Sequence, residues 1–248
     1  MSGEQSVVFD RVADSYDATR GGMERGRRVA AVIAPLLPAG PVLEIGVGTG
    51  LIAAGLAELG RPPIGVDLSL PMLAAARKRI PGRLAVGDAL RLPVGTGAVA
   101  GVCLVHVLHL VADIPTTLDE IARVLRPGGS MVTTAFAGPS SGDLPEEFDR
   151  LRDRVGGRPR TVDVPSVTRL AAEAGLTLSA HVAGPDDGTT PRAAAGLVET
   201  RSLSWMWAVD DEVWAQELPV ALQRLRALPD QDRPRPAAGS TVLAFHHP

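Results

Sequence analysis

Between residues 42 and 136, short apolar runs alternate with longer amphipathic segments, and this alternation limits the fold more than any other feature. The apolar runs predict strands at residues 42–45, 63–66, 84–86, 98–105 and 130–136. The amphipathic segments predict helices at residues 51–59, 72–80 and 114–125. Strands joined through helices pair in parallel, because each helix returns the chain to the starting edge. The pattern therefore predicts an α/β protein with a mostly parallel sheet and helices on both faces.

The segments on either side of this stretch follow a less regular pattern. Helices are expected before it, at residues 8–16 and 29–37. After it we expect helices at 146–155, 166–174 and 210–228, strands at 176–182 and 241–245, and a polar turn region at 183–197. Trp205 and Trp207 are expected on the same side of an extended segment, either as the floor of a pocket or as core.

We expect one domain over residues 1–248, with N-terminal helices in residues 1–40 and the ligand-binding core in residues 41–136. The remainder, residues 137–248, contains two insertions, 137–165 and 185–239. These insertions are expected to cap the site and to select the substrate.

Composition and charge exclude several classes of function. The net charge of −3 argues against the concentrated basic face of a nucleic-acid-binding protein. Cys103 is the only cysteine, so neither an intrachain disulfide nor a zinc site built from cysteines can form. The five histidines show no metal-ligand spacing, which predicts metal-independent chemistry. No apolar stretch is long enough to span a membrane and no signal peptide is recognisable, so a cytoplasmic protein is expected. We also expect a monomer or a homodimer.

Three glycines follow the first expected strand, in the order Gly46-x-Gly48-x-Gly50. Glycines let the backbone turn sharply there, with no Cβ to block a ligand lying over the loop. The same residues would serve a tight structural turn, so the loop alone does not identify a ligand site. Asp67 and Asp88 close the next two strands, where a carboxylate can accept from ribose hydroxyls and from an exocyclic amine. Three strand ends together predict a ligand-binding edge.

The residue two positions before the first glycine, Glu44, separates two kinds of ligand. A dinucleotide fingerprint has its third glycine one residue later, and places a pyrophosphate against the helix that follows. Glu44 would repel a pyrophosphate but would attract a cationic ligand. S-adenosylmethionine carries a sulfonium and an amino group, and therefore suits this loop better than a nicotinamide dinucleotide does.

Several motifs in order now identify a family. Residues 42–50 resemble motif I of the class I S-adenosylmethionine-dependent methyltransferases, and residues 65–69 with Met72 resemble their post-I segment. Residues 87–93 are similar to motif II, and residues 125–129 to the usual entry into the fifth strand. The segment from Phe9 to Asp17 looks like the N-terminal helix of the ubiquinone/menaquinone-type and related small-molecule methyltransferases. The resemblance implies a Rossmann-like, seven-stranded sheet whose last strand is antiparallel.

The resemblance also implies cofactor contacts at ten positions. The methionyl portion of S-adenosylmethionine would be held by Glu44, Gly46, Gly48 and Gly50. The ribose would be bound by Asp67, and the adenine would lie among Leu68, Met72, Asp88 and Ala89. Tyr16 would fold over the cofactor, although it could equally be an amphipathic helix residue with its hydroxyl in water.

His106 and His109 follow the fourth expected strand and are the candidate catalytic residues. Methyl transfer from a sulfonium is an in-line displacement that depends chiefly on alignment and exclusion of water. A base helps when the acceptor carries a proton, and imidazole has a suitable pKa. His109 could instead be a packed helix residue.

The expected reaction is methyl transfer to an oxygen, nitrogen or carbon atom of a small molecule, such as a metabolite or natural-product intermediate. No Asn/Asp-Pro-Pro-Tyr segment, typical of methylation of nucleic-acid bases or protein glutamine, occurs. Two alternatives stay open. The same fold could perform cyclase or decarboxylase chemistry, or the chain could be a non-catalytic binding partner.

Overall fold

The computed structural model describes residues 16–17, 21–136, 141–156, 162–185, 188–207, 209–235 and 240–248. The chain divides into two compact units. The first, called here the sheet unit, comprises residues 1–136, 162–185 and 241–248, and the second, the helical unit, comprises residues 137–161 and 186–240. The assignment of residues 1–248 to one domain with capping insertions stays a prediction.

Seven strands form the sheet in the order β3-β2-β1-β4-β5-β7-β6. They are β1 Val42–Ile45, β2 Ile64–Asp67, β3 Leu84–Val86, β4 Val99–Leu104, β5 Leu125–Phe136, β6 Thr177–Ala183 and β7 Ser240–His246. β1 pairs in parallel with β2 and β4, β2 with β3, and β4 with β5. β7 is antiparallel to β6. The expected seven-stranded, mostly parallel sheet is confirmed.

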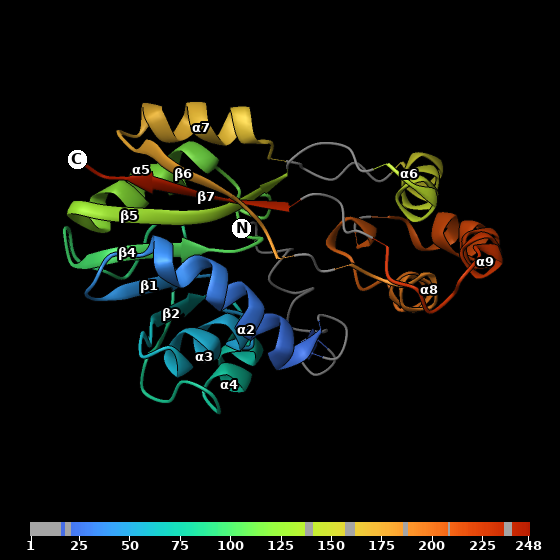
Figure 1. Ribbon diagram of the computed structural model, residues 1–248, viewed down its shortest axis with the longest axis horizontal. Coiled ribbons are helices and arrows are strands. Elements are labelled where there is room, and N and C mark those ends of the chain that lie inside the picture. Colours follow the sequence, from blue (N-terminus) through green and yellow to red (C-terminus); the bar gives the residue numbers. More distant parts are fainter. Residues whose placement is uncertain are drawn as a thin grey trace. The chain divides into compact units, whose positions relative to one another are not determined.

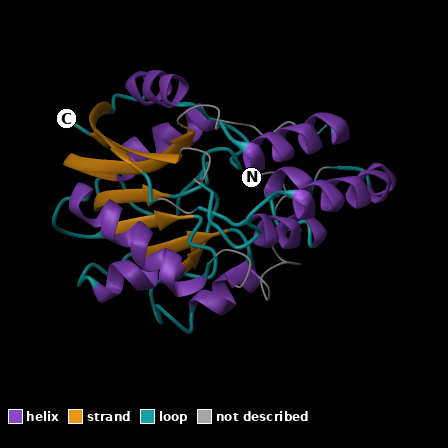
Figure 2. Cartoon of the chain, turned by 45° about the vertical axis from the view of Figure 1, so that its right-hand side comes forward, coloured by secondary structure: helices purple, strands orange, loops and turns teal. Residues whose placement is uncertain are grey.

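Helices cover both faces of this sheet (Figures 1 and 2). The helices of the sheet unit are α2 Gly22–Ile33, η1 Ala34–Leu36, α3 Leu51–Glu58, α4 Leu70–Ala76, α5 Ile114–Val124 and α7 Val164–Glu173. Apolar residues of α5 and α7 share one core cluster with Leu43 and Val102, whereas those of α2 and α3 share another with Val42 and Cys103. Successive strand residues thus enter opposite layers, as strand geometry requires.

The strand order places a ligand-binding crevice. Strand numbers fall from β3 to β1 on one side and rise from β4 to β7 on the other, so the order reverses between β1 and β4. In open α/β sheets, ligands bind outside the carboxyl ends of the strands at such a reversal. The glycine loop leaves β1 at this edge, and residues 105–113 leave β4 beside it.

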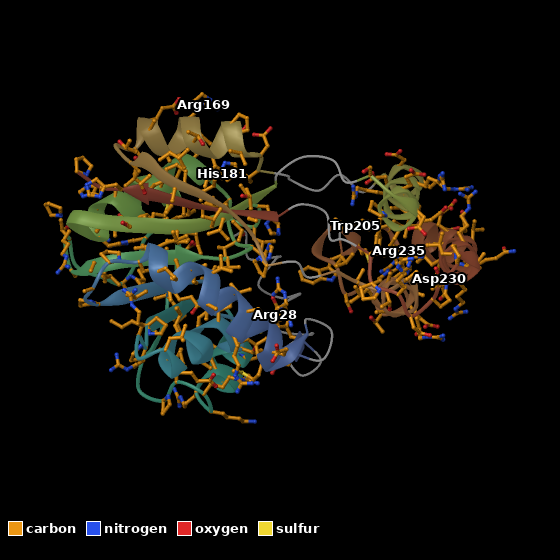
Figure 3. The ribbon with its side chains drawn as sticks, in the orientation of Figure 1. Arg28, Arg169, His181, Trp205, Asp230 and Arg235 are labelled. Atoms are coloured by element: carbon orange, nitrogen blue, oxygen red, sulfur yellow. The ribbon has the colours of Figure 1, made fainter. Side chains whose placement is uncertain are left out.

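The helical unit contains α6 Asp143–Val155, α8 Pro191–Glu199, η2 Ser204–Met206 and α9 Asp211–Ala227. Its core is formed by side chains of all four elements, among them Leu144, Val198, Met206 and Trp214. Arg235, labelled in Figure 3, donates from Nε to an Asp143 carboxylate oxygen at 3.0 Å. The helical unit therefore has its own apolar core. Among the described residues, no helix combines the length and apolar character that crossing a membrane would require.

Three local predictions are wrong. The predicted turn region at 183–197 contains α8, because the Thr190 side chain caps the Ala193 N–H at 3.1 Å and Pro191 starts the helix. Trp205 lies in η2 rather than in an extended segment, so spacing two does not place it on the same side as Trp207. β5 begins at Leu125 rather than at residue 130. The Gly128 N–H donates to the His247 carbonyl oxygen, and the His247 N–H donates to the Gly129 carbonyl oxygen.

Candidate functional site

The glycine loop is fixed to the end of β2 through its backbone. The N–H groups of Gly46 and Val47 both donate to the Val66 carbonyl oxygen, at 2.8 and 3.1 Å. Gly46, Gly48 and Gly50 have φ values of 67°, 54° and 80°, a left-handed region that side chains disfavour. The backbone conformation of the loop therefore favours glycine at all three positions.

The surroundings of these glycines differ. A Cβ at Gly46 would lie 2.5 Å from a Val107 methyl carbon, and one at Gly50 would lie 3.2 Å from the Ala76 Cβ. A Cβ at Gly48 would meet no atom of the described residues within 4 Å. Gly46 thus permits packing of the chain after β4, whereas Gly48 leaves open space over the loop, as a ligand cradle needs.

We predict that Gly48→Ala selectively impairs ligand binding. The variant should lose only about 1 kcal/mol of stability from the left-handed φ, because the added methyl has free space. The same methyl would enter the ligand space and should weaken S-adenosylhomocysteine binding by roughly tenfold or more. Urea unfolding and calorimetry measure both effects. Gly46→Ala is the matched control, and should destabilise more because its methyl meets Val107. A folded Gly48→Ala protein with wild-type affinity would argue against a cradle.

Glu44 is a buried carboxylate at the end of β1, with 3 % of its surface exposed. Its Oε2 atom has no hydrogen-bond partner among the described residues. Burial, and then the nearby charge of Asp67, raise the pKa of Glu44 to about 8. An ionised carboxylate in such a place requires a positive partner, so Glu44 suits a cationic ligand group.

Asp67 ends β2 beside Glu44, and is 8 % exposed. One carboxylate oxygen accepts from the Gly48 N–H at 2.8 Å, and the other accepts from the Ser69 N–H at 2.9 Å. Each oxygen has two acceptor positions, so the carboxylate can also receive ribose hydroxyls. Asp67 therefore links the glycine loop directly to the predicted ribose contact. Ser69 additionally caps α4 through the Met72 N–H at 3.2 Å.

The predicted adenine contacts follow β2 and β3. Asp88 lies just after β3 and is partly exposed, and its carboxylate accepts from the Leu90 N–H at 3.0 Å. Ala89 is buried, and Leu68 is partly exposed. Met72 is only 1 % exposed, so its side chain has little surface to offer a ligand in this conformation. Their roles at the adenine stay predictions.

Tyr16 lies in a short helical segment with Asp17, and the segment is tied to the glycine loop. The Asp17 carboxylate accepts from the Thr49 hydroxyl and from Arg79, each at 2.5 Å. Arg79 also donates to the Thr49 carbonyl oxygen at 2.8 Å. Tyr16 is therefore the sequence neighbour of a residue that is bound to the glycine loop. The sequence analysis did not predict this network of Asp17, Thr49 and Arg79. The remaining residues of the expected 8–16 helix lie outside the described part.

His106 and His109 both lie in the loop after β4. His106 is exposed, and its backbone N–H donates to the Thr134 hydroxyl oxygen at 2.8 Å. His109 is partly exposed and lies in a turn closed by a bond from the Leu110 N–H to the Val107 carbonyl. Val107 itself packs on Gly46, so this loop contacts the glycine loop. Their catalytic roles stay predictions.

The residues at this edge fit S-adenosylmethionine. Glu44 offers a buried carboxyl group whose ionised form a cation would stabilise, Gly48 leaves open space, and Asp67 offers acceptors to a ribose. No group of three or more metal-ligating side chains occurs within the described ranges.

Comparisons with known proteins agree with this geometry. Residues 43–133 match a family described as a methyltransferase domain. A demethylmenaquinone methyltransferase of Mycolicibacterium gilvum is 37 % identical over 145 residues, which cover 56 % of this chain and 63 % of that protein. The chain thus matches less than two thirds of the length of its first curated relatives.

Solved structures extend the likeness to the whole fold. A methyltransferase of Thermotoga maritima, described as a possible histamine N-methyltransferase, has a TM-score of 0.63 at 20 % identity and covers 98 % of this chain and 99 % of its own. The [4+2]-cyclase SpnF has a TM-score of 0.66 at 17 % identity, and the match covers 98 % of this chain and 94 % of SpnF. At these identities the likeness concerns the fold alone.

Proposed function

Since residues 43–133 match a methyltransferase domain and two curated relatives are demethylmenaquinone methyltransferases, we propose that the chain is a class I S-adenosylmethionine-dependent methyltransferase of the quinone-methyltransferase type, which transfers a methyl group from S-adenosylmethionine to a small molecule. The nucleophile is an oxygen, nitrogen or carbon atom of the acceptor. The other product is S-adenosylhomocysteine.

The observation that carries this proposal is the state of Glu44. A buried carboxylate whose Oε2 atom lacks a hydrogen-bond partner among the described residues is costly unless a ligand compensates it. A phosphate group would increase that cost, whereas a sulfonium and an ammonium would reduce it. Glu44 therefore favours S-adenosylmethionine over a nicotinamide dinucleotide at the same loop.

The bound cofactor supplies an electrophilic methyl group on a sulfonium. The chain itself has to hold and orient the cofactor, which we assign to Glu44, the glycine loop and Asp67. Tyr16 is proposed to cover it, since the neighbouring Asp17 is bound to Thr49. Alignment and removal of water then provide most of the rate, without a metal ion.

A reduced quinone or another hydroxylated aromatic compound is the acceptor class we favour. Curated relatives that are 37 % and 36 % identical to the matched part of the chain are named demethylmenaquinone methyltransferases. The net charge of −3 supports a small molecule rather than a nucleic acid as acceptor. Segments 137–165 and 185–239, with Trp205 and Trp207, are proposed to select it.

The test is incubation with methyl-labelled S-adenosylmethionine and a demethylated naphthoquinol. We expect labelled product and S-adenosylhomocysteine in equal amounts from the wild-type protein, and neither from Asp67→Ala. Acceptor consumed without S-adenosylhomocysteine would reject methyl transfer and favour non-methylating chemistry such as that of a cyclase.

A further inference from the structure

The chain leaves β4 through a backbone conformation that its sequence does not predict. His106 has a φ of 57°, in the left-handed region that residues with a Cβ disfavour. Within the described part of the sheet unit, it is the one non-glycine residue with a positive φ. Such conformations persist where neighbouring groups hold them, and they concentrate at functional sites.

The neighbouring strand β5 provides the group that holds this conformation. Thr134, which is buried, accepts the His106 N–H at its hydroxyl oxygen, 2.8 Å away. The preceding Thr133 pairs with Leu104, and its hydroxyl donates to the Leu104 carbonyl oxygen at 3.0 Å. The Thr133 hydroxyl therefore bonds at the last backbone pair of β4 and β5, and the Thr134 hydroxyl extends the contact beyond that pair to His106.

Packing of the next residue, Val107, fixes the backbone on the other side of His106. Val107 is buried against Gly46, whereas the His106 side chain is exposed. The His106 backbone thus lies between an anchor on β5 and a contact with the glycine loop. Its side chain starts from a fixed point at the edge where the cofactor is proposed to bind.

We propose that Thr134 is a positioning residue, which holds His106 in its left-handed conformation so that the imidazole can serve as base for a proton-bearing acceptor. The proposal rests on the proposed function and deepens it, because it selects His106 over His109 and requires an acceptor with an ionisable O–H or N–H. In the reaction the methyl group passes to that atom, the displaced proton goes to the imidazole, and S-adenosylhomocysteine leaves.

Three variants of the full chain test this assignment. Thr134→Val keeps the shape and removes the acceptor oxygen, Thr134→Ser retains that oxygen, and Thr133→Val is the matched control on the adjacent residue. The first readout is hydrogen exchange of the His106 backbone amide by NMR, which needs no turnover. The second is kcat for methyl transfer and its pH profile, with the KM for S-adenosylmethionine.

We expect Thr134→Val to speed exchange of the His106 amide and to lower kcat by roughly tenfold or more, with KM changed less than about twofold. The acidic limb of the pH profile, on which a base gains activity as it loses its proton, should flatten. Thr134→Ser should keep the exchange rate of the His106 amide and kcat close to their wild-type values. Thr133→Val should lower stability without altering either quantity. In a His106→Ala background, Thr134→Val should cause no further loss of kcat.

Unchanged exchange of the His106 amide in Thr134→Val would overturn the holding role. If Thr134→Val lowered kcat as much in the His106→Ala background as in the wild-type protein, Thr134 would not act through the imidazole. Absence of methyl transfer by the wild-type protein would instead reject the proposed function and, with it, the role as base, while the exchange readout would still decide whether Thr134 holds His106.

Discussion

Replacing Glu44 by glutamine is expected to flatten the dependence of stability on pH and, at the same time, to weaken cofactor binding. Burial and the charge of Asp67 raise the pKa of Glu44 from 4.5 to about 8 in the folded protein. A raised pKa stabilises the fold fully below pH 4.5, and this stabilisation is lost as the pH rises toward 8. The change over this window is about 4 kcal/mol, on an order-of-magnitude basis.

The measurement is urea unfolding of both proteins between pH 5 and pH 8. Because the remaining carboxylates are the same in both proteins, the difference between their curves isolates Glu44. We expect the free energy of unfolding of the wild-type protein, relative to Glu44→Gln, to fall by several kcal/mol across this range. If the two plots of unfolding free energy against pH ran parallel, Glu44 would already be ionised in the free protein, with a positive group compensating its charge.

The same substitution acts on binding in the opposite direction. A cationic ligand favours ionised Glu44, so binding should release a proton and should strengthen as the pH approaches 8. Glu44→Gln should weaken S-adenosylhomocysteine binding by about 10- to 100-fold and abolish the proton release. Calorimetry in buffers with different ionisation enthalpies measures that release. If Glu44→Gln made the free protein more stable and also weakened binding, Glu44 would serve ligand binding at a cost in stability.

Replacing Asp67 by alanine is expected to cause the largest loss of affinity, by about 100-fold or more. Hydrogen bonds to a charged group contribute about 1.5–3 kcal/mol each, and the variant loses the two expected from the ribose. It also loses the bonds from the Gly48 and Ser69 N–H groups that hold the loop against β2. In addition, the pKa of Glu44 should move toward its ordinary value, because the charge of Asp67 contributes to raising it.

The matched control is Asp163→Ala. Asp163 is also an aspartate of the sheet unit that accepts a backbone N–H, here from Ser166 at 2.8 Å at the start of α7. Its loss should lower stability slightly, because the cap of α7 is removed, and should have no effect on binding. Undiminished affinity in a folded Asp67→Ala protein would contradict the ribose assignment.

The sequence predicted the sheet and the cofactor edge because both depend on local patterns. Apolar runs separated by amphipathic helices define a parallel sheet, and strand ends then bring Glu44, Asp67 and Asp88 to one edge without further information. The helix α8 was missed because the polar residues before it concealed a cap at Thr190 and a start at Pro191.

Contacts between distant residues could not be predicted in this way. Asp17 meets Arg79 across 62 positions, and no local pattern links an acidic residue near one end to a basic residue after α4. The left-handed His106 and its bond to Thr134 depend on where β4 and β5 end relative to one another. Such features arise from strand register and tertiary packing, which a single sequence does not specify.

Competitive calorimetry decides whether the glycine loop binds S-adenosylmethionine or a nicotinamide dinucleotide. The wild-type protein should bind S-adenosylhomocysteine with one-to-one stoichiometry and should show no displacement by NAD at comparable concentration. Binding of NAD with displacement of S-adenosylhomocysteine, or no binding of S-adenosylhomocysteine at all, would contradict the assignment of Glu44 and Asp67.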